Sequence, residues 1–408
     1  MPELIDRRES LSDLISPKRD SKKPIYNWHS FKHSYSKALV DTLIKEFDLK
    51  KGAWVMDPFC GGGTTLLACK EAGINSRGYD ILPFSVFLTN VKTRNYDLAK
   101  LLKIRKNFRR LKRANIEFPS LESIPIAKKA FTPAVRDELI RIKQRIENVK
   151  DPNSRDFFNL GLLSILESVS KTSKAGGFLR LTKNYVRKDL IEPKFLLRID
   201  SMISDVQEFK RQMNGNNTSA EALLNDARKL STTRIYDAVI TSPPYPNRHD
   251  YSRIYSLEML FDFVKNNDEL KSIRYDTLRS HVEAKKRFSS NGYIKPKPLT
   301  RLLRKVKSNG TNNRMVLDML EGYFEDMYLA LQAMSKRLKR GGHLALVISN
   351  VRFAGVNIPV DKILFNIGHQ VGLNPKAIWI ARLRGNSSQQ MRDYSRKASR
   401  ESIVVWKK

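Results

Sequence analysis

Short apolar runs alternate with amphipathic stretches along much of the chain. The runs at 53–56, 237–241 and 343–349 are rich in β-branched or large apolar residues, which is typical of buried strands in a parallel sheet. Apolar residues recur every three or four positions at 37–47 and 317–338, which predicts amphipathic helices. Alternating strands and helices predict an α/β fold.

The C-terminal part adds a helix end and a hairpin to this pattern. The segment 339–342, Lys-Arg-Gly-Gly, is expected to cap the helix before it at its carboxyl end. Residues 377–383 and 401–408 are rich in Trp and β-branched residues, which favour strands. We expect these two segments to pair as a terminal hairpin of the sheet.

Three segments interrupt or precede the alternation. Residues 97–222 predict a mostly helical insertion, with helices expected at 101–113, 133–149, 157–171 and 190–213. Residues 266–315 look like a second insertion, basic and loop-like. Residues 1–24 are polar and charged and are expected to form a mobile basic arm.

The charge of the chain restricts its partners. The 408 residues include 75 Lys and Arg but 42 Asp and Glu, a formal net charge of +33, while 41% of residues are hydrophobic. This balance indicates a folded protein with a polyanionic partner, and nucleic acid is the first expectation. No apolar run is long enough to span a bilayer, so no membrane partner is expected. The N-terminal residues lack the order of a secretory signal, which favours a cytoplasmic location.

The cysteines and histidines argue against a metal or a disulfide framework. Cys60 and Cys69 are the only two cysteines, too few for a Cys-rich zinc site. The six histidines show no ligand-like spacing. We therefore expect no metal.

A rigid polar loop comes after the run at 237–241. It reads Ser242-Pro243-Pro244-Tyr245, and two prolines end a strand and stiffen the backbone after it. The Ser242 oxygen and the carbonyl between the prolines could accept hydrogen bonds from one exocyclic amine, and Tyr245 could stack on a flat ring. The alternative is a turn that only ends the strand.

A second motif joins a strand to a helix through a glycine-rich turn. The segment 57–65 reads Asp-Pro-Phe-Cys-Gly-Gly-Gly-Thr-Thr, and such turns let a ligand approach the backbone closely. No Lys-Ser/Thr follows the glycines, so the turn is not a P-loop, and Asp57 favours a cationic ligand. Asp80 lies roughly 20 residues further on, where an acidic residue binds ribose hydroxyls in βαβ nucleotide folds. A helix N-cap is the alternative role for Asp80.

These two motifs resemble those of amino-methylating DNA methyltransferases, which carry Asp-Pro-Phe-x-Gly-(Ser/Gly)-Gly-Thr-Thr and (Asp/Asn/Ser)-Pro-Pro-(Tyr/Phe/Trp). The resemblance implies S-adenosylmethionine as cofactor. It assigns the cofactor to Asp80 and to the first motif, Asp57, Pro58, Phe59, Cys60, Gly61, Gly63 and Thr64.

Two further segments resemble parts of the same family. Asn225-Asp226-Ala-Arg resembles its third cofactor motif, in which Asp226 would accept from the adenine amino group; a plain turn is the alternative. The aromatic and histidine-rich segment 26–36 resembles the part that packs over the methionine end of the cofactor. Ordinary aromatic packing is the alternative for that segment.

The resemblance covers a catalytic core at 25–96, 223–265 and 316–408. It implies a Rossmann-like, seven-stranded, mostly parallel class I methyltransferase sheet. The serine form of the catalytic motif is most typical of cytosine-N4 enzymes. The implied activity is site-specific methylation of cytosine N4 in double-stranded DNA, in a restriction-modification system whose endonuclease acts separately.

In that interpretation, a base flipped out of the duplex meets Ser242, Pro243, Pro244 and Tyr245. Polar and aromatic residues after the loop are expected along its path, namely Arg248, His249, Tyr251 and Arg253. His249 is the one plausible general base, but a sulfonium is such a good leaving group that none is required.

Other functions stay open from sequence. Adenine-N6 methylation could use the same loop, RNA methyltransferases can carry Pro-Pro-Tyr loops, and a non-catalytic nucleic-acid binder could keep the fold. Cytosine-C5 enzymes use a Pro-Cys nucleophile, and neither cysteine here follows a proline. Either insertion could read the DNA sequence. Within the first insertion, the basic, glycine-containing stretch 173–183 is expected to be flexible and could reach DNA or the base pocket.

Overall fold

The computed structural model describes residues 3–118, 121, 124–212, 218–311, 313, 315–385 and 397–408. Eight strands form the main sheet, in spatial order β1-β11-β12-β8-β7-β2-β3-β6. β12 runs antiparallel to both neighbours, and the other pairs are parallel. The strands are β1 (Leu4–Asp6), β2 (Trp54–Asp57), β3 (Asn75–Asp80), β6 (Ala220–Leu224), β7 (Tyr236–Thr241), β8 (Leu338–Ser349), β11 (Asn374–Arg384) and β12 (Ser399–Lys407). The predicted α/β class is confirmed, as is the terminal hairpin, β11 with β12.

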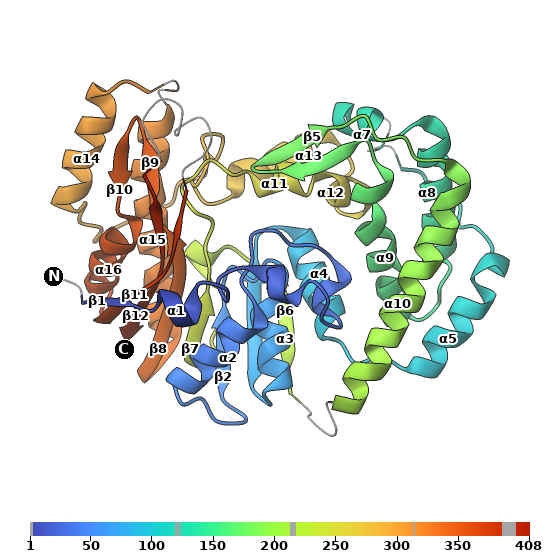
Figure 1. Cartoon of the computed structure of the whole chain (residues 1–408), viewed down its shortest axis with the longest axis horizontal. Coiled ribbons are helices and arrows are strands. Elements are labelled where there is room, and N and C mark those ends of the chain that lie inside the picture. Colours follow the sequence, from blue (N-terminus) through green and yellow to red (C-terminus); the bar gives the residue numbers. More distant parts are fainter. Residues whose placement is uncertain are drawn as a thin grey trace.

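Helices cover both faces of this sheet, as alternation along the central strand requires. On β7, Ala238 and Ile240 pack with α2 (Lys37–Glu46) and with α3 (Thr64–Glu71). Val239 faces the opposite side, where α15 (Met315–Arg337) and α16 (Val360–Gln370) lie. Figure 1 shows the sheet between these layers.

The N-terminal segment is not the mobile arm that its polar composition predicted. β1 pairs with β11 as an eighth strand, with Leu4 opposite Ile378. After α1 (Arg8–Leu11), Leu11, Leu14 and Ile15 are buried against the α2 face. These few apolar residues are enough to dock a segment whose remaining residues are mostly polar.

The predicted cap at 339–342 is also wrong. α15 ends at Arg337, and β8 begins at once with Leu338. The backbone N–H of Gly341 donates to Lys408, and that of Lys408 donates to Gly342. Pairing with the C-terminus therefore draws this segment into the sheet.

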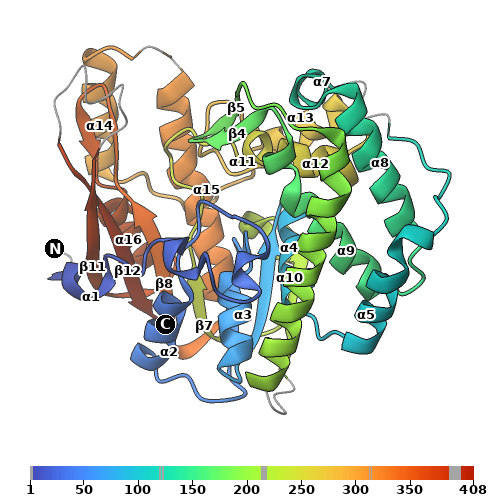
Figure 2. The ribbon, with the colours of Figure 1, turned by 45° about the vertical axis from the view of Figure 1, so that its right-hand side comes forward.

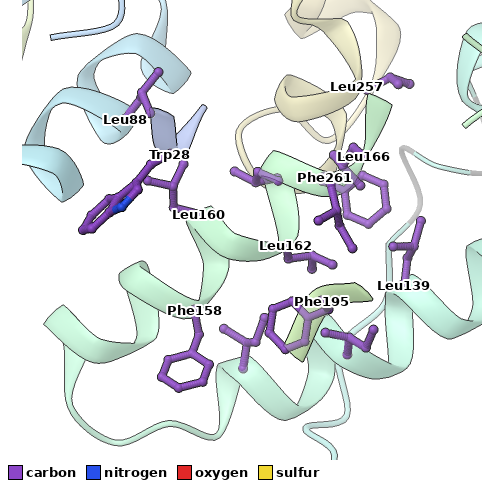
Figure 3. Packing of buried hydrophobic residues seen from close by; sticks show 14 of the residues in the cluster. Trp28, Leu88, Leu139, Phe158, Leu160, Leu162, Leu166, Phe195, Leu257 and Phe261 are labelled. Carbon is purple, nitrogen blue, oxygen red and sulfur yellow. The ribbon is translucent and has the colours of Figure 1, made fainter. Parts of the chain in front are cut away.

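The predicted helical insertion consists of α5 (Leu98–Asn107), α7 (Pro125–Ala130), α8 (Pro133–Glu147), α9 (Pro152–Ile165) and α10 (Ile191–Gln212). It shares one apolar cluster with the core: Trp28 and Leu88 lie close to Leu160 in Figure 3. Leu88 belongs to α4 (Pro83–Thr93), which follows β3. The shared cluster fixes the insertion against the catalytic core.

The stretch 173–183, expected to be flexible, forms most of a hairpin instead. β4 (Thr172–Ala175) pairs with β5 (Phe178–Leu181) in antiparallel register. Figures 1 and 2 show this hairpin extending from the helical insertion toward the middle of the molecule. The Gly-Gly pair that suggested flexibility is its turn.

The second insertion is not loop-like throughout. It contains α13 (Asn267–Asp276) and α14 (Lys297–Ser308). Leu299, Leu303 and Val306 are buried on one side of α14, a helical spacing hidden among basic residues. Two short helices lie between the catalytic loop and this insertion, α11 (Tyr251–Ile254) and α12 (Ser256–Asp262).

A small antiparallel pair lies near the C-terminus, where β9 (Val351–Phe353) pairs with β10 (Val356–Ile358). Within the described ranges, no helix is both long and apolar enough to cross a bilayer.

Candidate active site

The ends of the parallel strands β2, β3, β6 and β7 open into one pocket. It holds about 910 Å³ of empty space, including its opening to solvent. Most of the predicted site residues line it: Asp57, Pro58, Phe59, Cys60, Gly61, Thr64, Asp80, Asp226, Ser242 and Pro244. We refer to it as the acidic pocket, because Asp57, Asp80 and Asp226 all line it.

The glycine turn is shaped by Gly63, which does not itself line the acidic pocket. Gly63 has φ +77° and precedes α3, and its N–H donates to the Cys60 carbonyl over 2.8 Å. A Cβ at Gly63 would lie 2.9 Å from Thr89 Oγ1. Both the left-handed backbone and the close approach of α4 require glycine here.

An aromatic side chain from the N-terminal segment covers the same turn. A Cβ at Gly62 would lie 2.8 Å from the Phe31 Cβ, and one at Gly61 would lie 2.9 Å from its Cε1. The Phe31 ring stacks on Tyr255 with centroids 4.6 Å apart. The segment 26–36 therefore lies at the acidic pocket, which Phe31, His33, Ser34 and Tyr35 help to line.

Asp57 is a buried carboxylate held by neutral donors. It accepts from the Thr241 hydroxyl over 2.6 Å, from the Phe59 N–H over 3.1 Å and from the Tyr35 hydroxyl over 3.4 Å. Burial raises its pKa, and these hydrogen bonds only partly oppose the rise. Asp57 makes no ion pair within the part of the chain that the structure describes. A cationic ligand would therefore stabilise its charged form.

Asp80 holds the glycine turn from the end of β3. One carboxylate oxygen accepts from the Gly61 N–H and the other from the Leu82 N–H, both over 2.9 Å. Burial raises its pKa to about 6, although the backbone hydrogen bonds lower it. Each oxygen keeps a lone pair for a further donor, such as a ribose hydroxyl. The hydrogen bond from the Leu82 N–H, near the start of α4, is therefore compatible with the predicted ribose role.

Asp226 lines the pocket but is already engaged. It forms an ion pair with Arg228 at 2.7 Å, and both of its oxygens accept from that guanidinium. Arg228 is buried and also pairs with Asp326 at 2.9 Å. The carboxylate is thereby fixed at the pocket wall, and its role toward adenine stays a prediction.

The Ser242–Tyr245 loop leaves the sheet where β7 ends. The Ser242 hydroxyl donates to the Val347 carbonyl of β8 over 3.1 Å. Its one hydrogen is thus engaged, and its oxygen is left as an acceptor. Pro243 is buried, whereas Ser242 lines both the acidic pocket and a second, adjoining pocket.

Tyr245 faces that second pocket, where it is held by residues that sequence reasoning missed. Its hydroxyl donates to Glu401 over 3.2 Å. Glu401 is buried and forms an ion pair with Arg382 of β11. No local signal marks Glu401, because it reaches the loop from a strand 156 residues further along the chain.

The residues predicted along the nucleotide path surround the openings next to Tyr245. His249 and Tyr251 line the second pocket, and Arg248, His249 and Arg253 line a third that Tyr245 also lines. We refer to these two together as the outer pockets. Burial lowers the pKa of His249, helped by the charge of Arg384, so the imidazole is neutral at neutral pH.

A buried ionic cluster beside the site was also missed. Lys174 of β4 pairs with Glu258 of α12 at 2.5 Å, and the His29 Nε2 lies 2.9 Å from the same Glu258 oxygen. Burial and Lys174 lower the pKa of His29 to about 4. Burial raises the pKa of Glu258, but Lys174 and His29 outweigh it and bring the value to about 2. A neutral His29 therefore donates to a charged Glu258.

Comparison with known proteins places this site in a family. A family profile described as DNA methylase matches residues 10–89. Type II methyltransferase M.BsoBI of Geobacillus stearothermophilus is 31% identical over 97% of this chain and 88% of its own length. M.AvaI of a Nostoc species is 31% identical over 98% of this chain and 90% of its own length. Type II methyltransferase M.MvaI of Kocuria varians is 22% identical over 83% of this chain and 81% of its own length.

The chain belongs to the amino-methylating DNA methyltransferases. It is thus an enzyme that acts on DNA, and S-adenosylmethionine is its methyl donor. This family includes enzymes for both amines, adenine N6 and cytosine N4.

Proposed function

We propose that the protein methylates N4 of cytosine at a specific site in double-stranded DNA, as the modification enzyme beside a separate restriction endonuclease. The observation that carries the proposal is the place of Ser242, which lines both the acidic pocket and the second pocket and keeps its oxygen as an acceptor. A methyl donor in the first and a base in the second would meet at this residue.

The acidic pocket suits the donor. Asp57 is buried and Asp80 half-buried, and neither carboxylate forms an ion pair among the described residues, which suits a ligand with a positive charge and hydroxyl groups. Asp80 is assigned to the ribose, Asp226 to the adenine amine, and the turn from Asp57 to Thr64 to the methionine part. S-adenosylmethionine supplies an electrophilic methyl group on a sulfonium.

The second pocket suits the target base. Ser242 Oγ and the Pro243 carbonyl accept from the exocyclic amine, which keeps the nitrogen lone pair directed at the methyl group. Tyr245 stacks on the ring, and Glu401 holds the tyrosine in place. Orientation of this kind and exclusion of water supply most of the acceleration. The amine gives up its proton to water after transfer, so His249 has no essential part.

The choice of cytosine rests on the serine form of the motif, which is most typical of cytosine-N4 enzymes. The restriction partner rests on the relatives, which are named Type II methyltransferases. Adenine N6 remains the second candidate, because the same loop can hold either amine.

Incubation with labelled S-adenosylmethionine and duplex DNA, followed by mass spectrometry of the digested nucleosides, tests the proposal. N4-methylcytosine is the expected product. N6-methyladenine would overturn the base assignment but keep the two-pocket mechanism. Absence of any modified nucleoside would overturn the activity itself.

A further inference from the structure

The hairpin β4–β5 reaches the catalytic loop from the helical insertion. A Cβ at Gly177, in its turn, would lie 2.9 Å from His249 Cδ2 and 3.3 Å from the His249 Cα. β5 also packs against α11, the first helix after that loop. The hairpin turn is therefore in close contact with the chain four residues after Tyr245.

The residue after this turn is a large apolar side chain with little protein around it. Phe178 is 57% exposed, and it lines the third pocket together with Tyr245 and His249. A phenylalanine ring left in water forgoes the stabilisation that its burial would give. Its position beside the opening for the base suggests that a ligand covers it.

The hairpin carries charges that suit DNA. Lys171, Arg180 and Lys183 are at least partly exposed, and none of them forms an ion pair within the described ranges. Arg180 and Phe178 are two residues apart on β5, so they lie on the same face of the hairpin. Cations beside an exposed apolar tip are the pattern of side chains that contact phosphate while a wedge enters between bases.

The hairpin is also anchored close to its turn, at Lys174 of β4, which pairs with Leu179 one position from the Ala175–Phe178 pair. Lys174 is buried and pairs with Glu258 of α12, and the Lys174 N–H donates to Glu167 over 2.8 Å. The Lys32 ammonium, from the segment that covers the glycine turn, donates to the Lys174 carbonyl over 2.5 Å. The hairpin is thus fixed to both halves of the active site, as a rigid wedge needs.

We propose that Phe178 enters the DNA stack next to the target nucleotide and fills the space that the flipped base leaves. This inference rests on the proposed base flipping into the second pocket. Extruding a base loses its pairing and stacking energy. An aromatic ring held at the gap recovers part of the stacking and delays return of the base. Phe178 is a positioning residue in this account, since it acts on the duplex and not on the transferred methyl group.

Comparison of two duplexes tests the proposal. The first contains the fully paired methylation site, mapped by sequencing the methylated DNA. The second has an abasic site opposite the target base, which is then unpaired and easily extruded. Phe178→Ala should lower kcat/KM by roughly ten-fold or more on the first duplex and less than about three-fold on the second. Phe178→Tyr, which keeps a ring, should restore most of the activity.

Leu181→Ala is the matched control. Leu181 lies on the same strand and is 50% exposed, but it pairs with Thr172 at the far end of the hairpin, so both duplexes should be methylated normally. An equal loss on the two duplexes with Phe178→Ala, or no loss on either, would overturn the wedge. Failure of the unaltered protein to methylate DNA would instead overturn the proposed function.

Discussion

The two halves of the active site differ in charge and in enclosure. The acidic pocket holds three aspartates, two of which, Asp57 and Asp80, have no cationic partner in the described chain. The outer pockets are lined by more cations than anions, among them Arg248, Arg253 and Arg384. Each half thus suits a ligand of opposite charge, which under the proposed function is a sulfonium cofactor on one side and DNA phosphates on the other.

This contrast indicates where each ligand is recognised. A carboxylate withdrawn from water costs stability unless a cation or donors compensate it, and in the proposed assignment the bound cofactor would offset this cost at Asp57 and Asp80. The exposed arginines cost little stability with or without a bound ligand, and they attract the DNA phosphates over a long range. Substitutions in the two halves should therefore have separable effects on the two ligands.

The largest difference between the effect on catalysis and the effect on cofactor binding is expected at Tyr245. Tyr245→Ala removes the stacking surface and the orientation of the base, and should lower kcat by roughly 1000-fold or more. Affinity for S-adenosylmethionine, measured by calorimetry, should stay within a few-fold of normal. An equal loss of cofactor affinity would show that the ring belongs to the acidic pocket. Tyr245→Phe keeps the ring without its bond to Glu401 and should lose far less.

The buried cluster that joins the halves is expected to matter for stability. Lys174→Met leaves Glu258 charged and buried without its cation, and should cost about 3 kcal/mol of the free energy of unfolding, measured by chemical denaturation. Adding Glu258→Gln to that variant should restore part of the loss, because it removes the unpaired charge. A double variant less stable than Lys174→Met would contradict this account of the cluster.

Asp80 should affect the cofactor alone. Asp80→Ala removes the acceptor for the Gly61 N–H and the proposed acceptor for the ribose, and should weaken S-adenosylmethionine binding by roughly 10- to 100-fold. DNA affinity, measured by fluorescence anisotropy, should be unchanged. Unaltered cofactor binding would remove Asp80 from the site.

A smaller effect is expected from pH. Burial raises the pKa of Asp80 to about 6, so its carboxylate becomes protonated as the pH falls through that value. Cofactor affinity should be constant above pH 7 and about ten-fold lower at pH 5, where roughly a tenth of the group is ionised. Asp80→Asn should bind more weakly at pH 7.5 but with a flatter pH profile, and an unchanged profile would assign the titration elsewhere.

Much of the site was predictable because its motifs are local. The turn from Asp57 to Thr64 and the loop from Ser242 to Tyr245 each follow a strand that the apolar pattern already predicts. Residues of both motifs line the acidic pocket and the second pocket. The family resemblance implied a mostly parallel sheet of seven strands, and β1 adds an eighth. In these parts, neighbouring residues carry enough information to define the backbone.

The rest depended on contacts between distant segments. Lys174 and Glu258 are 84 residues apart, and nothing in either neighbourhood indicates the pair. β1 was hidden because a three-residue edge strand has too short a pattern to detect, and α14 because its apolar stripe lies among many basic residues. Asp226 was found, but its bidentate pairing with Arg228 was not.

A crystal structure with S-adenosylhomocysteine would show most directly whether donor and base occupy adjoining pockets that meet at Ser242. We expect the ligand in the acidic pocket, with its ribose at Asp80 and its sulfur turned toward Ser242. A ligand bound in the outer pockets, or with its sulfur directed away from Ser242, would contradict the two-pocket arrangement.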